Sequence, residues 1–328
     1  MSCKRANKGS AEKRRIMKRK NSIIKSNNCN KIKNHSLSDR LLDVVNYTVF
    51  SLFAFVCVYP FYYIFINTIS NNKISESGGV VWFPKGIHLQ NYIDAFKIPG
   101  LGQAAFISIS RTIIGTALTL IIAAFLGYMF TRETMFKRRF WYRFVVVTMY
   151  FNAGIIPWYL TMMNLGLTNN FLGYILPTLV SPFYIILTKT YIESTPKEIQ
   201  EAAECDGAGI LTMFYKIMLP ICKPILATIA IFSAVGHWNS FQDTLLLMTQ
   251  EKYYTLQFIL YRYLQSSQSL SAIVNATAGS AGAMLANTQT QTSIRMTVTI
   301  IVALPIMMIY PFFQRFFVKG IMIGAVKG

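Results

Sequence analysis

Residues 195–220 read TPKEIQEAAECDGAGILTMFYKIMLP, and this polar segment lies between two long apolar stretches of the chain. Its first residues are typical of a helix start, with Thr195 as the N-cap, proline at the first helical position and Glu198 closing a capping box. Gly207 suits a left-handed C-cap, which predicts a first helix of about three turns. A second short helix is predicted from Ile210 to Met218. The segment therefore predicts a small helix-turn-helix.

Apolar stretches recur on both sides of this segment. Six of them are long enough to cross the hydrocarbon core of a membrane, which takes about 20 helical residues. They run approximately over residues 44–69, 107–130, 142–163, 171–192, 221–247 and 296–317. Because no alternating strand pattern competes with them, a helical bundle is favoured over an outer-membrane barrel. The sequence thus predicts an all-α integral membrane protein.

The predicted spans divide the chain into a tail and a membrane domain. Residues 1–40 form a basic tail that is too polar to bury a core, and residues 41–328 form the membrane domain. The loop of residues 193–220 is too long for a simple connection and must hold structure of its own. Leu219-Pro220 is predicted to end that structure before the fifth span. Ala153-Gly154 could kink the third span.

Composition and charge placement support this division. Of the 328 residues, 53% are hydrophobic and only 14% are charged, against about 25% in soluble domains, which argues against a soluble enzyme. The net charge of +19 would suggest nucleic-acid binding in a polar chain. However, 25 of the 32 lysines and arginines fall in the tail, in residues 131–143 and 189–223, and near the C-terminus. The positive-inside rule then predicts that both termini are cytoplasmic, with no nucleic-acid partner.

Several kinds of chemistry lack support in the sequence. The three histidines are far apart and the five cysteines form no C-x-x-C pair, so no metal site is predicted. No phosphate-binding loop of the G-x-x-x-x-G-K-[ST] type occurs, so we expect no ATP site of that kind in this chain. The spans contain few ionisable groups. Two of these, Arg111 and Asp243, are expected near the outer helix ends, where they reach the headgroups. A role facing the transport pathway is the alternative.

One motif carries a resemblance to a known family. Glu201-Ala202-Ala203, followed at fixed spacing by Gly207, Ile217 and Leu219-Pro220, matches the EAA motif of binding-protein-dependent ABC permeases at every defined position. Three further segments resemble the carbohydrate-uptake, maltose-permease-like branch: Pro196-Lys197-Glu198-Ile199, Trp238-Asn239-Ser240-Phe241 and residues 320–328. Across residues 40–328 the chain looks like permeases of the LplC/YtcP type, often described as aldouronate or complex-oligosaccharide importers.

The resemblance implies a fold, a function and a set of partners. The fold would be the six-span ABC importer permease fold. The chain would be a transport subunit without enzymatic activity, carrying a sugar or oligosaccharide across a bacterial cell membrane. A second permease would form a heterodimer with it, an extracellular sugar-binding lipoprotein would deliver substrate, and a cytoplasmic ABC ATPase dimer would bind ATP and Mg. Glu201, Ala202, Ala203 and Gly207 would couple to the ATPase, and Lys327 and Gly328 would contact it at the C-terminus.

The residues themselves leave other functions open. A secondary transporter driven by an ion gradient is one alternative, and a protein that binds lipid or nucleic acid through its basic tail is another. Membrane lipid is in any case an expected partner, because basic residues near the surface attract anionic lipid. The tail could equally be solvated and serve only to orient the first helix.

A sugar pathway should be lined by polar and aromatic side chains at mid-depth. Six residues of the third and fifth spans qualify: Tyr150, Asn152, Trp158, Trp238, Asn239 and Gln242. Asn239 and Gln242 are three apart and are expected to share a helix face. Such residues also form interfacial belts and helix contacts, which is the alternative. On the outer face, the loops of residues 70–106 and 249–295 are expected to contact either the lipoprotein or the partner permease.

Overall fold

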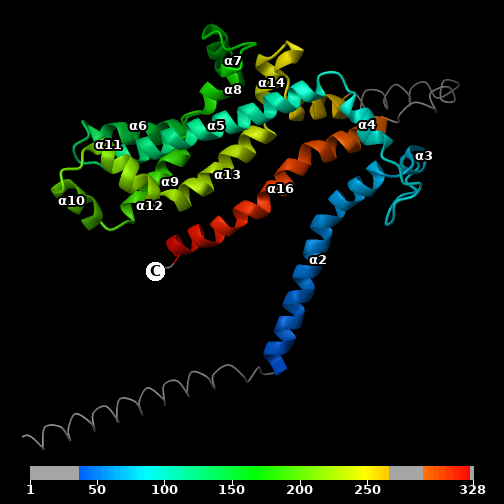
Figure 1. The fold of residues 1–328 in the computed structure, drawn as a ribbon, viewed down its shortest axis with the longest axis horizontal. Coiled ribbons are helices and arrows are strands. Elements are labelled where there is room, and N and C mark those ends of the chain that lie inside the picture. The colour runs from blue at the N-terminus through cyan, green and yellow to red at the C-terminus, as the bar shows by residue number, and fades with distance from the viewer. Residues whose placement is uncertain (1–36, 266–290, 326–328) are drawn as a thin grey trace, which may run out of the picture. The chain divides into compact units, whose positions relative to one another are not determined.

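A computed structural model describes residues 37–265 and 291–325 of the chain (Figure 1). The described residues contain helices and connecting segments but no strand. The chain divides into two units, Met1–Tyr62 and Tyr63–Gly328. Helix α2 (Leu37–Thr68) begins in the first unit and ends in the second. Most of the predicted basic tail lies outside the described residues.

Three helices are individually long and apolar enough to cross a membrane. They are Arg40–Thr68 within α2, all of α5 (Leu101–Met129) and Thr292–Ile309 within α16 (Gln291–Ala325). These helices coincide with the first, second and sixth predicted spans. The other three predicted spans are not continuous helices, so an apolar run in the sequence does not correspond to one unbroken helix there.

Each of the other predicted spans is bent at a short break. The third consists of α6 (Arg138–Tyr150) and α7 (Ile155–Asn164), which are 120° apart. The fourth consists of α8 (Leu172–Ile175) with η2 (Leu176–Thr178), followed at 48° by α9 (Pro182–Glu193). The fifth consists of α13 (Lys223–Asn239) and α14 (Gln242–Leu247), which are separated at Ser240 and Phe241. At its start, α13 is bent by 77° from the helical segment Ile210–Ile221 of the preceding loop.

Local backbone geometry explains two of these breaks. Phe151 is extended and Gly154 has a φ of 87°, a conformation that favours glycine. The side-chain oxygen of Asn152 accepts a hydrogen bond from the Gly154 amide at 2.9 Å, so the predicted kink is a complete break. In the fifth span, α13 ends at Asn239 and Ser240 is extended. The expected shared helix face of Asn239 and Gln242 is therefore absent, because no single helix contains both residues.

Helix α5 is the central packing element of the second unit. It lies against α13 and α9, and α13 also packs against α16. Two glycines allow the close approach. A Cβ added at Gly115 would come within 2.5 Å of the His237 ring on α13, and one added at Gly127 would come within 2.7 Å of the Thr188 Cβ on α9. Small residues at such contacts are characteristic of membrane helix packing.

The connecting segments gather at the two ends of α5. Near its Leu101 end lie η4 (Glu251–Tyr253) and the helical residues 256–265, and Gln103 donates a hydrogen bond to the Lys252 carbonyl at 3.3 Å. The loop of residues 70–106 folds into α3 (Asn72–Glu76) and α4 (Gln90–Phe96), which both contact α16. The loop of residues 193–220 packs at the Met129 end. Segments predicted to face outward and inward thus lie at opposite ends of α5.

Candidate functional site: the EAA loop and a buried polar cluster

The EAA loop, residues 193–220, begins differently from the prediction. Its first helix, α10, spans Glu198–Cys205 and has no side-chain cap. The Thr195 hydroxyl donates to the Ile192 carbonyl at 2.6 Å and so closes the end of α9. The predicted capping box is therefore not formed, because the threonine hydroxyl is committed to a backbone carbonyl of the preceding helix.

The end of α10 matches the prediction at Gly207. This residue has a φ of 77°, its amide donates to the Glu204 carbonyl at 3.0 Å, and the Ala208 amide donates to the Ala203 carbonyl at 3.0 Å. These two bonds define a Schellman C-cap, for which glycine is the favoured residue. The left-handed C-cap is confirmed.

The second part of the EAA loop is longer than predicted. Helix α11 (Ile210–Met213) runs into the π-helical turn η3 (Phe214–Met218) and then α12 (Leu219–Ile221). Leu219-Pro220 does not end the helical segment, because proline is tolerated in the first turn of α12. The break before α13 instead lies at Cys222.

One side of the EAA loop is built into the membrane domain. Ala203 is 7% exposed, and it packs in an apolar cluster with residues of α5, α9 and the later part of the loop: Ala124, Tyr128, Ile192, Met213, Phe214, Met218 and Cys222. By contrast, Glu201, Ala202 and Gly207 are exposed. The four predicted coupling residues therefore divide into one that anchors the loop and three that face away from the cluster.

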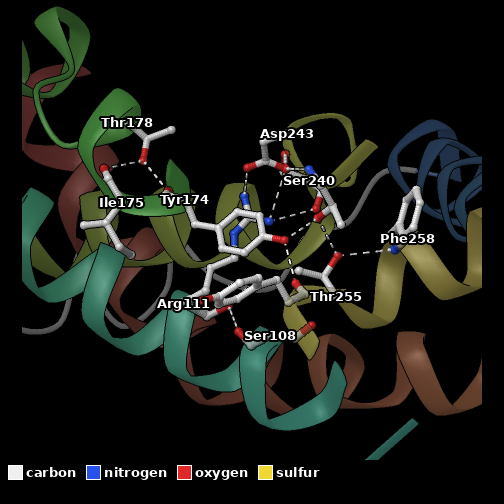
Figure 2. Close-up of polar contacts among 12 residues, drawn as sticks. Ser108, Arg111, Tyr174, Ile175, Thr178, Ser240, Asp243, Thr255 and Phe258 are labelled. Atoms are coloured by element: carbon white, nitrogen blue, oxygen red, sulfur yellow. Dashed lines mark hydrogen bonds and ion pairs between the residues drawn. The ribbon is translucent and has the colours of Figure 1, made fainter. Parts of the chain in front are cut away.

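A second set of residues, which we call the polar cluster, joins α5 to the broken fifth span. Arg111 on α5 is 1% exposed, and its guanidinium group forms an ion pair with Asp243 on α14 (Figure 2). It also donates to the Ser240 carbonyl at 3.1 Å. The expectation that Arg111 and Asp243 reach the headgroups separately is wrong. Oppositely charged residues in apolar spans tend to pair with each other, and that tendency was the signal available in the sequence.

Tyr174 and three hydroxyl residues complete the polar cluster. The buried Tyr174 ring lies 4.7 Å from the Arg111 guanidinium carbon, and its hydroxyl donates to the Tyr253 carbonyl at 2.6 Å. That hydroxyl oxygen forms a second hydrogen bond with the Thr244 hydroxyl at 3.1 Å, and Thr244 bonds Thr255 at 3.1 Å. Ser108 accepts a hydrogen bond from the Leu256 amide at 2.9 Å. The cluster thus ties α5, α8 and α14 to the segment that follows η4 (Figure 2).

Two cavities adjoin the polar cluster. The smaller, of about 230 Å³, is lined by Trp158, Gln242 and Asp243 among others, so two of the predicted pathway residues meet there. The larger, of about 470 Å³, is lined by Arg111, His237 and several hydroxyl side chains. Ser240 lines both cavities.

The other predicted pathway residues lie elsewhere. Trp238 is 8% exposed and its indole N–H donates to the Val302 carbonyl at 3.0 Å, so it anchors α13 to α16. Asn239 accepts a hydrogen bond from Gln257 at 3.1 Å. Tyr150, which is 83% exposed, and Asn152 lie at the break between α6 and α7 and line neither of the two cavities.

Two other predictions concern ligands and the C-terminus. Within residues 37–265 and 291–325, the structure contains no group of three or more His, Cys, Asp or Glu side chains that could hold a metal ion. Lys327 and Gly328, the predicted C-terminal contact, lie outside the described residues.

Comparison with known proteins identifies relatives along most of the chain, although no family model matches it. Protein LplC of Bacillus subtilis (strain 168) is 31% identical over 289 residues, which are 88% of this chain and 96% of LplC. The polygalacturonan/rhamnogalacturonan transport system permease protein YtcP of the same organism is 29% identical, over 89% of this chain and 100% of YtcP. The arabinooligosaccharides transport system permease protein AraQ of Halalkalibacterium halodurans is 26% identical, over 85% and 94%.

A solved structure agrees with these relatives. A crystal structure of a bacterial ABC transporter involved in the import of the acidic polysaccharide alginate matches with a TM-score of 0.76 and 30% identity, covering 87% of this chain and 99% of the matched chain. Subunits of this kind are not enzymes, because ATP hydrolysis belongs to a separate subunit. Together with the apolar helices, these similarities place the protein in a bacterial cell membrane. The chain therefore belongs to the family of ABC importer permeases, in its carbohydrate-uptake branch.

Proposed function

We propose that this chain imports a sugar or oligosaccharide as one of two permease subunits of an ATP-driven transporter. In this proposal α6 with α7, α8 with α9, and α13 with α14 each form one span, so the membrane domain of residues 41–328 crosses the membrane six times and both termini are cytoplasmic. The basic residues of the EAA loop and of residues 131–143 support that orientation. The partners are a second permease, an extracellular sugar-binding lipoprotein and a cytoplasmic ATPase dimer that binds ATP and Mg.

The observation that carries the proposal is the two-sided construction of the EAA loop. Ala203 is held in the apolar cluster, while Glu201, Ala202 and Gly207 are exposed. Ile199 on α10 is 41% exposed and Leu211 on α11 is 62% exposed. A short helix with small and apolar exposed residues is suited to insertion into a groove of a partner protein. In this proposal that groove is on the ATPase, and Lys327 and Gly328 add a C-terminal contact.

Substitution of Gly207 tests this coupling role. Gly207→Pro cannot adopt the φ of 77° and removes the amide that bonds the Glu204 carbonyl, so the exposed turn of the EAA loop should change shape. We expect sugar uptake by cells to be lost while the amount of protein in the membrane is unchanged. Ala203→Glu, which places a charge in the apolar cluster, should have the same effect.

The matched control is Gly209→Ala, because a Cβ at Gly209 would meet nothing within 4 Å and its φ is ordinary for alanine. This variant should transport normally. Normal uptake by Gly207→Pro would contradict the coupling role. Uptake into vesicles that persists without ATP but stops when ion gradients are collapsed would instead support a secondary transporter. Transport that survives removal of residues 1–35 would exclude a function that depends on the basic tail.

We assign the sugar pathway to the side of the bundle that holds the smaller cavity. Trp158 offers an aromatic face and Gln242 an amide, which are the groups that a sugar ring and its hydroxyls require. Tyr150, Asn152 and Asn239 are exposed on nearby segments and would meet substrate only at the subunit interface. Arg111, which lines the larger cavity, is paired with Asp243, which lines the smaller one.

Kinetics of uptake test the pathway assignment. Trp158→Ala and Gln242→Ala should each raise the KM for uptake by about tenfold, since each removes contacts to the sugar worth about 1–2 kcal/mol. Trp141→Ala is the matched control, because Trp141 lies on α6 and lines neither cavity. Unchanged KM values for both pathway variants would contradict the assignment.

A further inference from the structure

Arg132 lies three residues beyond the last residue of α5, Met129, and its side chain reaches both helices of the EAA loop. Its guanidinium group forms an ion pair with Glu204 on α10. It also donates to the side-chain oxygen of Gln200 on α10 at 3.3 Å and to the Met213 sulfur on α11 at 3.4 Å. One side chain therefore contacts both α10 and α11 of the loop.

The backbone that carries Arg132 is fixed to the end of α5. The Thr131 amide and hydroxyl both donate to the Tyr128 carbonyl, at 2.9 and 2.6 Å, and Arg138 donates to the Thr131 carbonyl at 2.9 Å. The Arg132 side chain is 12% exposed, and its guanidinium carbon lies 5.8 Å from the centre of the buried Tyr128 ring. The guanidinium group is thus held at a defined position relative to α5.

The remaining contacts between α5 and the EAA loop are of a different kind. The rings of Phe125 and Tyr128 pack against Phe214 at centroid distances of 5.5 and 5.6 Å. Such apolar and aromatic packing is less directional than a charge-assisted hydrogen bond. The planar, five-donor guanidinium group of arginine imposes a direction on its partners. Arg132 therefore adds a directional contact between the end of α5 and the EAA loop.

The opposite half of α5 carries the other buried arginine contact. Arg111 is 21 residues before Arg132 in the sequence, a separation of about 30 Å along a helix. There it holds Asp243 on α14, beside the cavities. Helix α5 is uninterrupted from Arg111 to its end at Met129, so one continuous element joins the contact with the EAA loop to the contact with α14.

From this arrangement we propose that Arg132 is a positioning residue that transmits movement of the EAA loop to α5, and through α5 to the polar cluster. The inference rests on the proposed function, because the movement originates in the ATPase. It assigns the transmission to a contact within this chain, between Arg132 and Glu204. Arg132 touches neither substrate nor nucleotide in this role.

The test compares variants in the complete importer reconstituted in liposomes. Arg132→Gln and Glu204→Gln each remove the ion pair, and the double exchange Arg132→Glu with Glu204→Arg restores a pair of reversed polarity. Arg139→Gln is the matched control, because Arg139 is an exposed arginine on α6, close to Arg132 in the chain. Sugar uptake and ATP hydrolysis are measured on the same samples, and the readout is sugar transported per ATP hydrolysed.

We expect both single variants to hydrolyse ATP but to transport about tenfold less sugar per ATP, in the usual range of coupling between distant sites. The double exchange should recover most of that ratio, Arg132→Lys should recover part of it, and Arg139→Gln should leave it unchanged. A merely structural role would lower the amount of protein in the membrane without changing the ratio.

An unchanged ratio in Arg132→Gln, or a double exchange no better than the single variants, would overturn the inference. The proposed function has a separate test in Gly207→Pro. If that variant abolishes uptake while Arg132→Gln keeps a normal ratio, only the role of Arg132 fails. If Gly207→Pro transports normally, the coupling function of the EAA loop fails as well.

Discussion

At the scale of single residues, the main finding is that Arg111 and Asp243, two charged residues of the predicted spans, are paired with each other. Arg111 and Asp243 are 1% and 12% exposed and form a buried ion pair. Asp243 is further satisfied by the Ser240 hydroxyl at 2.9 Å and the Thr244 amide at 3.0 Å. A buried pair of this kind is costly to break, because the remaining partner keeps an uncompensated charge in a medium of low dielectric constant.

This pairing predicts a difference between single and double substitution. Arg111→Gln should lower the free energy of unfolding by about 3–5 kcal/mol, because Asp243 is left charged and unpaired. The double variant Arg111→Gln with Asp243→Asn should lose less, since no charge remains to be compensated. Thermal unfolding of the purified protein in detergent measures both. If the double variant is as unstable as the sum of the two single variants, the residues do not act as a pair.

At the scale of secondary-structure elements, the fold combines interrupted helices with one long uninterrupted helix. The break between α13 and α14 places Asp243 opposite Arg111. At the break between α6 and α7, the segment around Asn152 is not helical. The uninterrupted α5 provides the surface on which α9 and α13 pack. Gly115 and Gly127 permit these contacts, since a Cβ at either position would overlap the neighbouring helix.

Substitutions along α5 should therefore depend sharply on position. Gly115→Ala places a methyl group 2.5 Å from the His237 ring, so α13 must shift, and we expect a loss of about 1–3 kcal/mol of stability. Gly102→Ala on the same helix is the control, because a Cβ there meets nothing within 4 Å. It should be neutral or slightly stabilising, since alanine favours helix. Equal melting temperatures for the two variants would show that the α5–α13 contact is looser than described.

At the scale of the whole molecule, the proposed topology places two groups of connecting segments on opposite sides of the membrane. The segments around α4 and η4, which are predicted to face outward, gather near Leu101, while the EAA loop packs near Met129 at the other end of α5. The basic residues of segments 131–143 and 189–223 belong to the end with the EAA loop. Because a lysine or arginine is costly to move across a membrane, we expect the end of α5 with the EAA loop to remain in the cytoplasm.

Labelling of cysteines tests this topology. Cys205 is exposed on α10, and Lys85→Cys would place a second thiol in the loop that contains α3 and α4. In intact cells, a membrane-impermeant maleimide should label position 85 but not Cys205. In inside-out vesicles the pattern should reverse, and mass spectrometry of the peptides distinguishes the sites from other cysteines. Labelling of Cys205 from outside the cell would contradict the proposed orientation.

The sequence alone was sufficient for the features that depend on local or additive properties. Apolar length located the six candidate spans, basic residues predicted the orientation, and the spacing of the EAA motif predicted the family. The C-cap at Gly207 was also predictable, because a left-handed residue after a helix favours glycine. Each of these signals is contained in a short segment or in the amino-acid composition of a region.

Only the tertiary structure decided how distant segments combine. The Arg111–Asp243 and Arg132–Glu204 pairs join residues that are 132 and 72 positions apart. Hydropathy could not locate the breaks in the bent spans, because an apolar run has the same composition whether its helix is straight or broken. The sequence left Trp238 as either a pathway residue or a contact between helices, and packing against α16 gave its indole N–H the Val302 carbonyl as a partner. Buried polar groups take the partner that the fold brings within reach, and no local sequence pattern specifies that partner.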